Sequence, residues 1–289
     1  MFLISLIVLA VILLAFIVFI SHKMTQPKRT VGDWNPGDLG IDYEDVSFIT
    51  DDGVEIKGWW IDKGSDKTLI CLHGYTASRW YDVYMKPLLK ILKDEPYNLL
   101  LIDFRAHGES MGSRCTFSDK EYLDLEASID WLEENHATKC EKLGLIGYSM
   151  GAMVAIKGLA SDERVDCSVA DSPPIDPDGT SSRSLKYFAG LPSSLYHLIK
   201  PVSSLLYGIK HPDMYDFAEQ IDKPLLLIGG KNDPIVKVDE IRSFYDINRQ
   251  KNKDVTLWIT EGEHVRSLKR VPKEYKKRTI SFLTRYMRG

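Results

Sequence analysis

Six short runs of apolar residues, each with little polar alternation, constrain the fold of this 289-residue chain more than any other feature. The runs are residues 68–72, 98–102, 143–146, 167–170, 225–228 and 255–259. A strand without a polar face is covered on both sides, which is typical of a parallel sheet with helices on its two faces. Helical patterns separate the runs. We therefore predict a doubly wound, mostly parallel α/β sheet.

Turn and boundary signals add detail to this scheme. Residues 45–50 and 54–61 read as strands, and the Asp-Gly pair between them indicates a hairpin ahead of the parallel strands. Ser118 and Glu121 match a capping box at the start of a helix expected over residues 119–135. Pro272 is expected to open the last helix, and we interpret the basic residues near it as that helix's solvated face.

One long connection breaks the alternation of strands and helices. Roughly 50 residues separate Asp171 from Lys223, far more than an ordinary α/β loop. Leucines and aromatic residues recur there at near-helical spacing. We predict a small helical cap inserted at about residues 173–222, the alternative being a plain crossover with extra surface helices.

The N-terminal segment has the length and composition of a membrane span. Residues 2–20 are apolar except for Ser5, and about 20 such residues cross the hydrocarbon core as a helix. The rival interpretation is a cleaved signal peptide, which has a basic start, a shorter apolar stretch and a small-residue cleavage site. The segment lacks these features. We favour an uncleaved, single-pass transmembrane anchor over residues 1–22.

The residues that follow the span bear on orientation and domain limits. Three basic side chains come soon after it: Lys23, Lys28 and Arg29. The positive-inside rule then places the soluble domain in the cytoplasm. We expect residues 23–44, which are rich in Gly and Pro, to form a linker and residues 45–289 to form the folded domain.

Charge and cysteine content argue against two classes of protein. The formal net charge is −4, whereas a nucleic-acid partner usually requires a basic surface. The four cysteines form no CxxC pair and no Cys/His cluster, so no metal site is predicted.

The segment Gly147-Tyr148-Ser149-Met150-Gly151 matches the pattern G-x-S-x-G. It directly follows an apolar run and precedes small, helix-compatible residues, which is the strand–turn–helix setting of a nucleophile elbow. The serine of an elbow lies on a strained turn, and the glycines remove side chains that would collide across it. Its hydroxyl projects at a helix N-terminus, where amide groups favour negative charge. We predict Ser149 as a nucleophile.

A serine nucleophile needs a base and a carboxylate that orients the base. His264 follows the last apolar run, and Asp233 follows the run before it. Doubly wound sheets place their sites at such strand ends. The chain order Ser149, Asp233, His264 is the order expected for this kind of fold.

Other candidates are weaker. Asp171, at the end of the 167–170 run, is a rival acid, but Asp233 fits the expected order better. We interpret His73 and His107 as structural, because neither follows the last strand.

From about residue 45 to 287 the chain resembles the α/β-hydrolase superfamily. It is most similar to capped members related to monoacylglycerol lipases, bacterial carboxylesterases and the serine aminopeptidase-like group. Leu72-His73-Gly74-Tyr75 resembles their oxyanion-hole strand end, and residues 229–236 match their G-x-x-D-x-x-V acid segment. Residues 103–110 are similar to their D-x-R-G-H-G-x-S loop, with Ala106 in place of glycine.

The resemblance implies hydrolysis of an acyl bond through an acyl-enzyme, without a cofactor. It also implies an oxyanion hole made by the backbone N–H groups of Tyr75 and Met150. We therefore hypothesise a membrane-anchored serine hydrolase of carboxylic esters, whose substrates are small acyl esters with apolar chains. The alternatives are a peptidase or amidase of the same fold and a non-catalytic binding protein of that fold.

Overall fold

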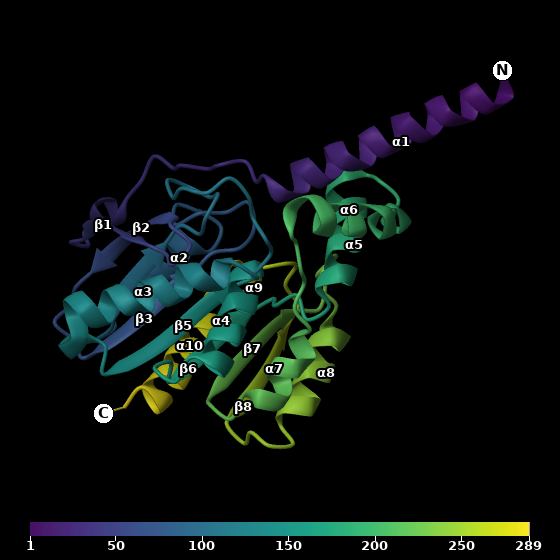
Figure 1. Ribbon diagram of the computed structural model, residues 1–289. Helices are drawn as coiled ribbons and strands as arrows, with labels where there is room; N and C mark the ends of the chain where they lie inside the picture. The colour runs from purple at the N-terminus through teal and green to yellow at the C-terminus, as the bar shows by residue number, and fades with distance from the viewer. Residues whose placement is uncertain (289) are drawn as a thin grey trace.

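The computed structural model describes residues 1–288 and is built around one eight-stranded sheet (Figure 1). The spatial order of the strands is β1-β2-β4-β3-β5-β6-β7-β8. Their bounds are β1 Glu44–Ile49, β2 Glu55–Ile61, β3 Lys67–Leu72, β4 Asn98–Ile102, β5 Lys142–Tyr148, β6 Cys167–Asp171, β7 Leu225–Gly230 and β8 Val255–Thr260. Strand β2 runs antiparallel to both neighbours, and the pairs from β4 to β8 are parallel.

The prediction of a doubly wound, mostly parallel sheet that follows a hairpin is confirmed. Each of the six apolar runs forms a strand, and those inside the sheet are covered on both faces, whereas β8 at the edge of the sheet is only partly buried. Every residue of β4 and of β7 is buried. The Asp-Gly turn joins β1 to β2 in antiparallel register, as the sequence indicated.

Helices cover the two faces of the sheet and form two separate cores. One face is covered by α2 Met85–Leu92, α9 Ser267–Arg270 and α10 Pro272–Tyr286. The other face is covered by α3 Glu121–His136, α4 Met150–Ser161, α7 Met214–Gln220 and α8 Val238–Asn248. Short 3₁₀ turns occur at η1 Pro36–Leu39, η2 Ala137–Lys139 and η3 Ser193–Leu195.

The long connection between β6 and β7 is helical, as predicted. Its helices α5 (Pro177–Ala189) and α6 (Tyr196–Tyr207) stand above the carboxyl ends of the strands and form the cap (Figure 1). Helix α7, at the end of the same connection, instead packs against α4 and α8 on the sheet. The cap therefore consists of α5, η3 and α6.

The capping box predicted at residues 118–121 is only half formed, so this prediction is wrong in part. Glu121 accepts a hydrogen bond from the Ser118 amide at 2.7 Å, as a capping box requires. Ser118 itself has φ 89°, and its buried hydroxyl has no partner within residues 1–288. A backbone turned into the left-handed region directs the serine side chain away from the first helical amides. Glu121 instead also holds both the amide and the hydroxyl of Thr116, at 2.8 Å each.

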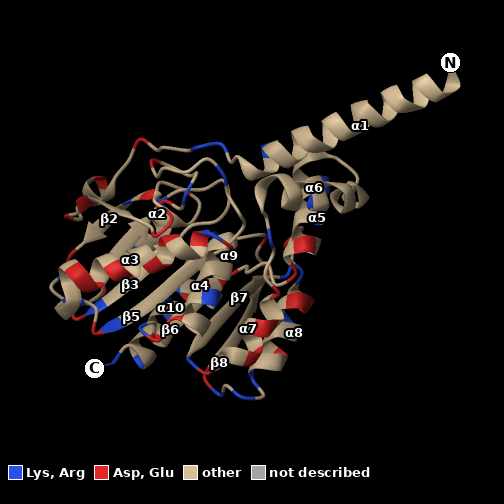
Figure 2. Cartoon of the chain, in the orientation of Figure 1, with Lys and Arg blue, Asp and Glu red and all other residues tan. Residues whose placement is uncertain are grey.

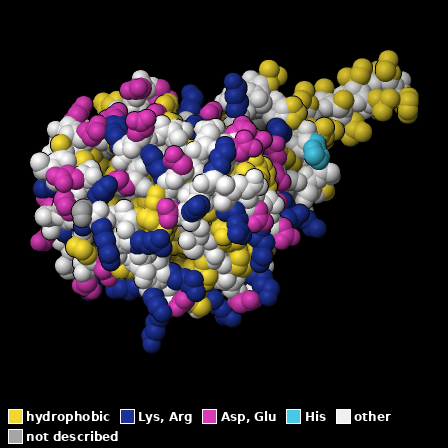
Figure 3. Space-filling view, turned by 90° about the horizontal axis from the view of Figure 1, so that it is seen from below, with side chains coloured by type: hydrophobic (Ala, Val, Ile, Leu, Met, Phe, Trp, Pro, Cys, Tyr) yellow, Lys and Arg dark blue, Asp and Glu magenta, His cyan; other side chains and the backbone are white. Residues whose placement is uncertain are grey.

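The N-terminal helix α1 covers Phe2–Thr25 and projects away from the sheet (Figure 1). It is the one helix of residues 1–288 that is long and apolar enough to cross a membrane, with a mean hydropathy of 3.5 over its most apolar 18 residues. A signal sequence near an N-terminus passes the same test of length and hydropathy. Lysine and arginine appear only near its inner end (Figure 2), and its hydrophobic side chains stand clear of the domain (Figure 3).

The last turns of α1 are part of the folded domain. Ile17 is buried in a cluster with Leu185, Tyr196 and Ile199 of the cap. The segment expected to be a linker is also docked, since the indole N–H of Trp34 donates to a backbone carbonyl at 2.7 Å. The end of α1 is therefore held against the cap and does not swing freely on a tether.

We predict that the two ends of α1 differ in their effect on stability. Deleting residues 2–15 removes exposed turns only, so the melting temperature in detergent should not change. Deleting residues 2–25 also uncovers the cap cluster around Ile17, and burial of one such side chain contributes about 1.5–3 kcal/mol. Thermal unfolding of both variants in the same detergent is the measurement. Equal melting temperatures would show that the contact between α1 and the cap contributes nothing.

Candidate active site

Ser149 lies at the sharp turn between β5 and α4, with φ 52° and ψ −116°. This left-handed backbone conformation is strained for any residue other than glycine. The turn is possible because its neighbours are glycines. A Cβ on Gly147 would lie 2.2 Å from the Gly151 carbonyl oxygen, and one on Gly151 would lie 2.3 Å from the Leu72 carbonyl oxygen. These close backbone contacts therefore require glycine at both ends of the G-x-S-x-G motif.

Three side chains from separate loops form a hydrogen-bonded chain at this turn. Nε2 of His264 lies 2.9 Å from Oγ of Ser149, and Nδ1 of His264 lies 2.7 Å from Oδ2 of Asp233. The other oxygen of Asp233 accepts hydrogen bonds from the amides of Ile235 and Val236, at 2.9 Å each. These amides fix the orientation of the Asp233 carboxylate, and the carboxylate in turn fixes the orientation of the His264 imidazole. The three residues selected from the sequence are brought together.

Asp171, the rival acid, lies below this chain and does not take part in it. It is fully buried at the end of β6, and its Oδ1 accepts a hydrogen bond from the Ser172 hydroxyl at 2.9 Å. Burial raises the pKa of Asp171 to about 7. A carboxyl group that is partly protonated at neutral pH is a poor partner for a cationic imidazole.

Two backbone amides near Ser149 are available to bind a negatively charged oxygen. The amides of Tyr75 and Met150 donate to no other protein group within residues 1–288. Met150 is the first residue of α4, whose N-terminus favours an anion. The neighbouring amide of Gly74 is already used, because it donates to the Tyr84 hydroxyl at 2.8 Å. The two amides predicted to form an oxyanion hole are therefore free.

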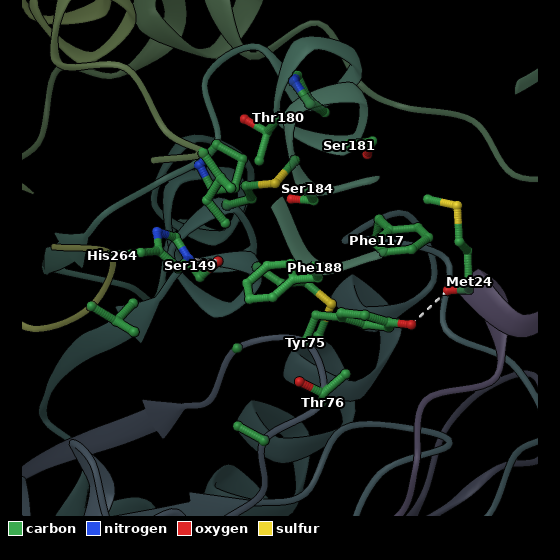
Figure 4. A pocket seen from close by; sticks show the side chains of 18 of the residues that line it. Met24, Tyr75, Thr76, Phe117, Ser149, Thr180, Ser181, Ser184, Phe188 and His264 are labelled. Atoms are coloured by element: carbon green, nitrogen blue, oxygen red, sulfur yellow. Dashed lines mark hydrogen bonds between the residues drawn. The ribbon is translucent and has the colours of Figure 1, made fainter. Parts of the chain in front are cut away.

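The loop that carries the Tyr75 amide is tied to the N-terminal helix. The phenolic hydroxyl of Tyr75 donates a hydrogen bond to the backbone carbonyl of Met24, at 2.8 Å (Figure 4). Met24 lies in the last turn of α1 and also lines the cavity in front of Ser149. No short motif in the sequence signals this contact, because the two residues are 51 positions apart.

The two other histidines near the site have structural roles. His73 is buried, and its Nε2 accepts a hydrogen bond from the Phe104 amide at 2.9 Å. Burial lowers the pKa of His73 well below its usual range and lowers that of His107 to about 4. Nε2 of His107 accepts from the Thr76 amide, at 3.2 Å, and so supports the same loop as Tyr75.

The loop of residues 103–110 is also structural. Asp103 is buried and accepts hydrogen bonds from the amide and the guanidinium of Arg79, at 2.8 Å each. Ala106 has φ 62°, a conformation that glycine adopts with less strain. The sequence difference at Ala106 thus falls where the backbone itself favours glycine.

A cavity of about 470 Å³ opens in front of Ser149 and His264 (Figure 4). Its lining combines the N-terminal helix, the sheet domain and the cap, and it includes Met24, Tyr75, Phe117, Met153, Phe188 and Ile235. None of the lining residues is Asp, Glu, Lys or Arg. Among residues 1–288, no group of three His, Cys, Asp or Glu side chains is placed to hold a metal ion.

Comparison with known proteins places these features in a family. Residues 67–196 match the family described as "alpha/beta hydrolase fold". The Bacillus subtilis protein YqkD is 28% identical over 239 residues, which are 80% of this chain and 76% of YqkD. The Escherichia coli (strain K12) protein YfhR is 24% identical over 234 residues, which are 77% of this chain and 73% of YfhR.

Solved structures agree with this assignment. The Pyrococcus furiosus esterase Pf2001 superposes with a TM-score of 0.83 at 48% identity, covering 92% of this chain and 99% of the esterase. The α/β hydrolase GrgF from Penicillium sp. sh18 covers 86% of this chain and 99% of its own length, with a TM-score of 0.68. Because the identity to GrgF is only 18%, this second similarity supports the fold alone. With its motifs, its sheet order and its 48% identity to Pf2001, the chain belongs to the α/β-hydrolase family.

Proposed function

We propose that this protein is a membrane-anchored serine esterase, with Ser149 as nucleophile, His264 as base and Asp233 as the orienting acid. The observation that carries the proposal is the chain of hydrogen bonds from Asp233 through His264 to Ser149, at the floor of an apolar cavity. The similarity to the Pyrococcus furiosus esterase supports ester hydrolysis as the reaction.

The proposed mechanism follows from these positions. His264 Nε2 takes the hydroxyl proton as Ser149 Oγ bonds to the ester carbonyl carbon, and the carbonyl electrons move onto oxygen. The amides of Tyr75 and Met150 donate to this oxyanion, and losing one such donor typically costs ~10²–10³ in rate. Collapse of the intermediate releases the alcohol, which takes the proton back from His264. Water, activated by the same imidazole, then hydrolyses the acyl-enzyme.

Two alternatives deserve a direct test. A peptidase or amidase would use the same groups, but the cavity has no acidic side chain to bind the amino terminus of a peptide. A non-catalytic protein that binds a ligand would have no need for two unpaired amides beside an activated serine. Labelling with a fluorophosphonate probe separates this binder from an enzyme, because the probe reacts only with an activated serine. We expect labelling of the wild type and none of Ser149→Ala.

We further propose that α1 is retained as an anchor rather than cleaved as a signal sequence. Its last turns supply a wall of the cavity through Met24 and cover the apolar face of the cap through Ile17. Cleavage after α1 would expose this face to water. The basic residues Lys23, Lys28 and Arg29 favour a cytoplasmic catalytic domain.

We predict that Asp233→Asn lowers kcat by about 10⁴, the loss seen when a triad imidazole takes the wrong tautomer. Asp171→Asn is the matched control, because its carboxyl group is equally buried but does not contact His264. This variant should keep most of the turnover. Steady-state kinetics on a soluble ester, with thermal unfolding to confirm folding, make the comparison. A greater loss from Asp171→Asn would overturn the assignment of the acid.

Tyr75→Phe should lower kcat several-fold and leave KM nearly unchanged. The change keeps the Tyr75 amide and the aromatic ring, but removes the hydrogen bond that ties this loop to Met24. One buried hydrogen bond contributes about 1 kcal/mol, which corresponds to roughly a fivefold effect. An unchanged kcat would mean that the loop is positioned without α1.

Specificity should rise with the length of the acyl chain. The cavity lining is mainly apolar, and each buried methylene contributes about 0.8 kcal/mol, or nearly fourfold in affinity, until the cavity is full. The measurement is kcat/KM for soluble esters of increasing acyl length, below their aggregation limit. A profile that is flat or falls beyond acetate would contradict an apolar acyl site and leave the triad unaffected.

A further inference from the structure

Exposed apolar side chains are concentrated in the cap. Outside α1 and the cap, residues 1–288 expose only three large hydrophobic residues, which are far apart in the sequence: Val31, Ile49 and Met111. The cap exposes more of them within a short stretch: Tyr187, Phe188, Leu198, Leu205 and Leu206. A clustered apolar surface of this kind usually marks an interaction site.

This surface is continuous with the membrane helix. Leu198 and Leu205 are seven residues apart in α6 and therefore lie on the same side of that helix. The adjoining side of α6 carries Ile199, which is buried with Ile17 of α1. The exposed stripe of α6 thus runs beside α1, whose Phe19 is itself 54% exposed.

The length of α1 sets the depth of the cap relative to a bilayer. At 1.5 Å per residue, the apolar segment 2–20 measures about 28 Å, close to the ~30 Å of a hydrocarbon core. Ile17 then lies about one helical turn from the end of the core. Since Ile17 packs on Leu185 and Ile199 of the cap, the cap helices that it contacts lie at the boundary between the hydrocarbon core and the lipid headgroups.

The lining of the cavity reaches this part of the molecule. Phe188, at the end of α5, lines the cavity and is 72% exposed. Met24, in the last turn of α1, lines another side of the cavity (Figure 4). The cavity is therefore lined both by the last turn of α1 and by a residue of the exposed surface of the cap.

We propose that the cap rests on the same bilayer that holds α1, with Phe188, Leu198, Leu205 and Leu206 among the headgroups, so that ester substrates enter the cavity directly from the lipid layer. The bilayer is the occupant that the geometry favours, because any partner on this surface must also accommodate the apolar flank of α1. This inference rests on the proposed function, since it requires α1 to be anchored. It adds that the substrates are lipid-borne esters.

The test uses the full chain reconstituted in phosphatidylcholine vesicles, with an environment-sensitive fluorophore on single introduced cysteines. Cys140→Ser is the background, because the three other native cysteines are buried. Labels at Leu205→Cys and Phe188→Cys should emit at shorter wavelength in vesicles and be quenched more by shallow than by deep nitroxide lipids. This pattern corresponds to insertion of about 5–10 Å into the headgroup region.

Two control positions make the outcomes distinguishable. A label at Ile12→Cys, which is 60% exposed in α1, should be quenched by deep nitroxides, and one at Ile49→Cys, which is 70% exposed on β1, should not be quenched. Quenching at residue 12 without quenching at 205 and 188 would overturn the docking of the cap and leave the anchor in place. No quenching at residue 12 would overturn both. Shielding of residue 205 that depends on protein concentration in detergent would identify a second copy as the occupant and overturn the proposal.

A kinetic measurement tests the route of the substrate. Leu205→Asp places a charge on the exposed stripe, outside the cavity lining. The rate of hydrolysis of a soluble short-chain ester should not change. The rate for a long-chain ester dispersed in vesicles should fall by roughly tenfold, because one leucine side chain no longer transfers from water into the lipid layer. Equal rates on the vesicle-borne ester would overturn entry from the lipid layer.

Discussion

The close approach of three backbone segments at the turn between β5 and α4 is the constraint on which the site depends. Gly151 lies against the carbonyl end of β3, and Gly147 lies against Gly151, with no space for a Cβ at either position. Only this packing holds Ser149 at φ 52° with its side chain directed into the cavity. The same turn places the Met150 amide at the start of α4 and beside the loop that follows β3. Ser149 and the free amide of Met150 are thus positioned by one backbone arrangement.

The parts of the structure that are determined by neighbouring residues could be predicted from the sequence. The strands were evident because a run such as residues 98–102 has no polar face, and the elbow because its glycines and its serine are adjacent. The chain order of Asp233 and His264 followed from the ends of successive strands. In each case the determining residues lie within a few positions of one another or follow a rule of topology.

Contacts between distant segments could not be predicted in this way. The hydroxyl of Tyr75 contacts Met24 because α1 packs on the cap, whereas the apolar pattern of α1 by itself indicates only a membrane span or a signal sequence. The capping box failed because the local arrangement extends beyond its four residues. Glu121 binds Thr116 as well as the Ser118 amide, and the Ser118 backbone has φ 89°. A motif of four residues does not contain that information.

The choice between two buried carboxyl groups shows how the environment, rather than the residue type, decides a role. Asp171 is the last residue of β6, Asp233 follows the adjacent parallel strand β7, and both side chains are almost fully shielded from water. Asp171 has a hydroxyl as its partner, so burial dominates and raises its pKa to about 7. Asp233 instead accepts hydrogen bonds from two backbone amides on one oxygen, and its other oxygen lies 2.7 Å from Nδ1 of His264. The two carboxyl groups therefore differ in their partners rather than in their burial, and only Asp233 is placed to orient the imidazole of His264 toward Ser149.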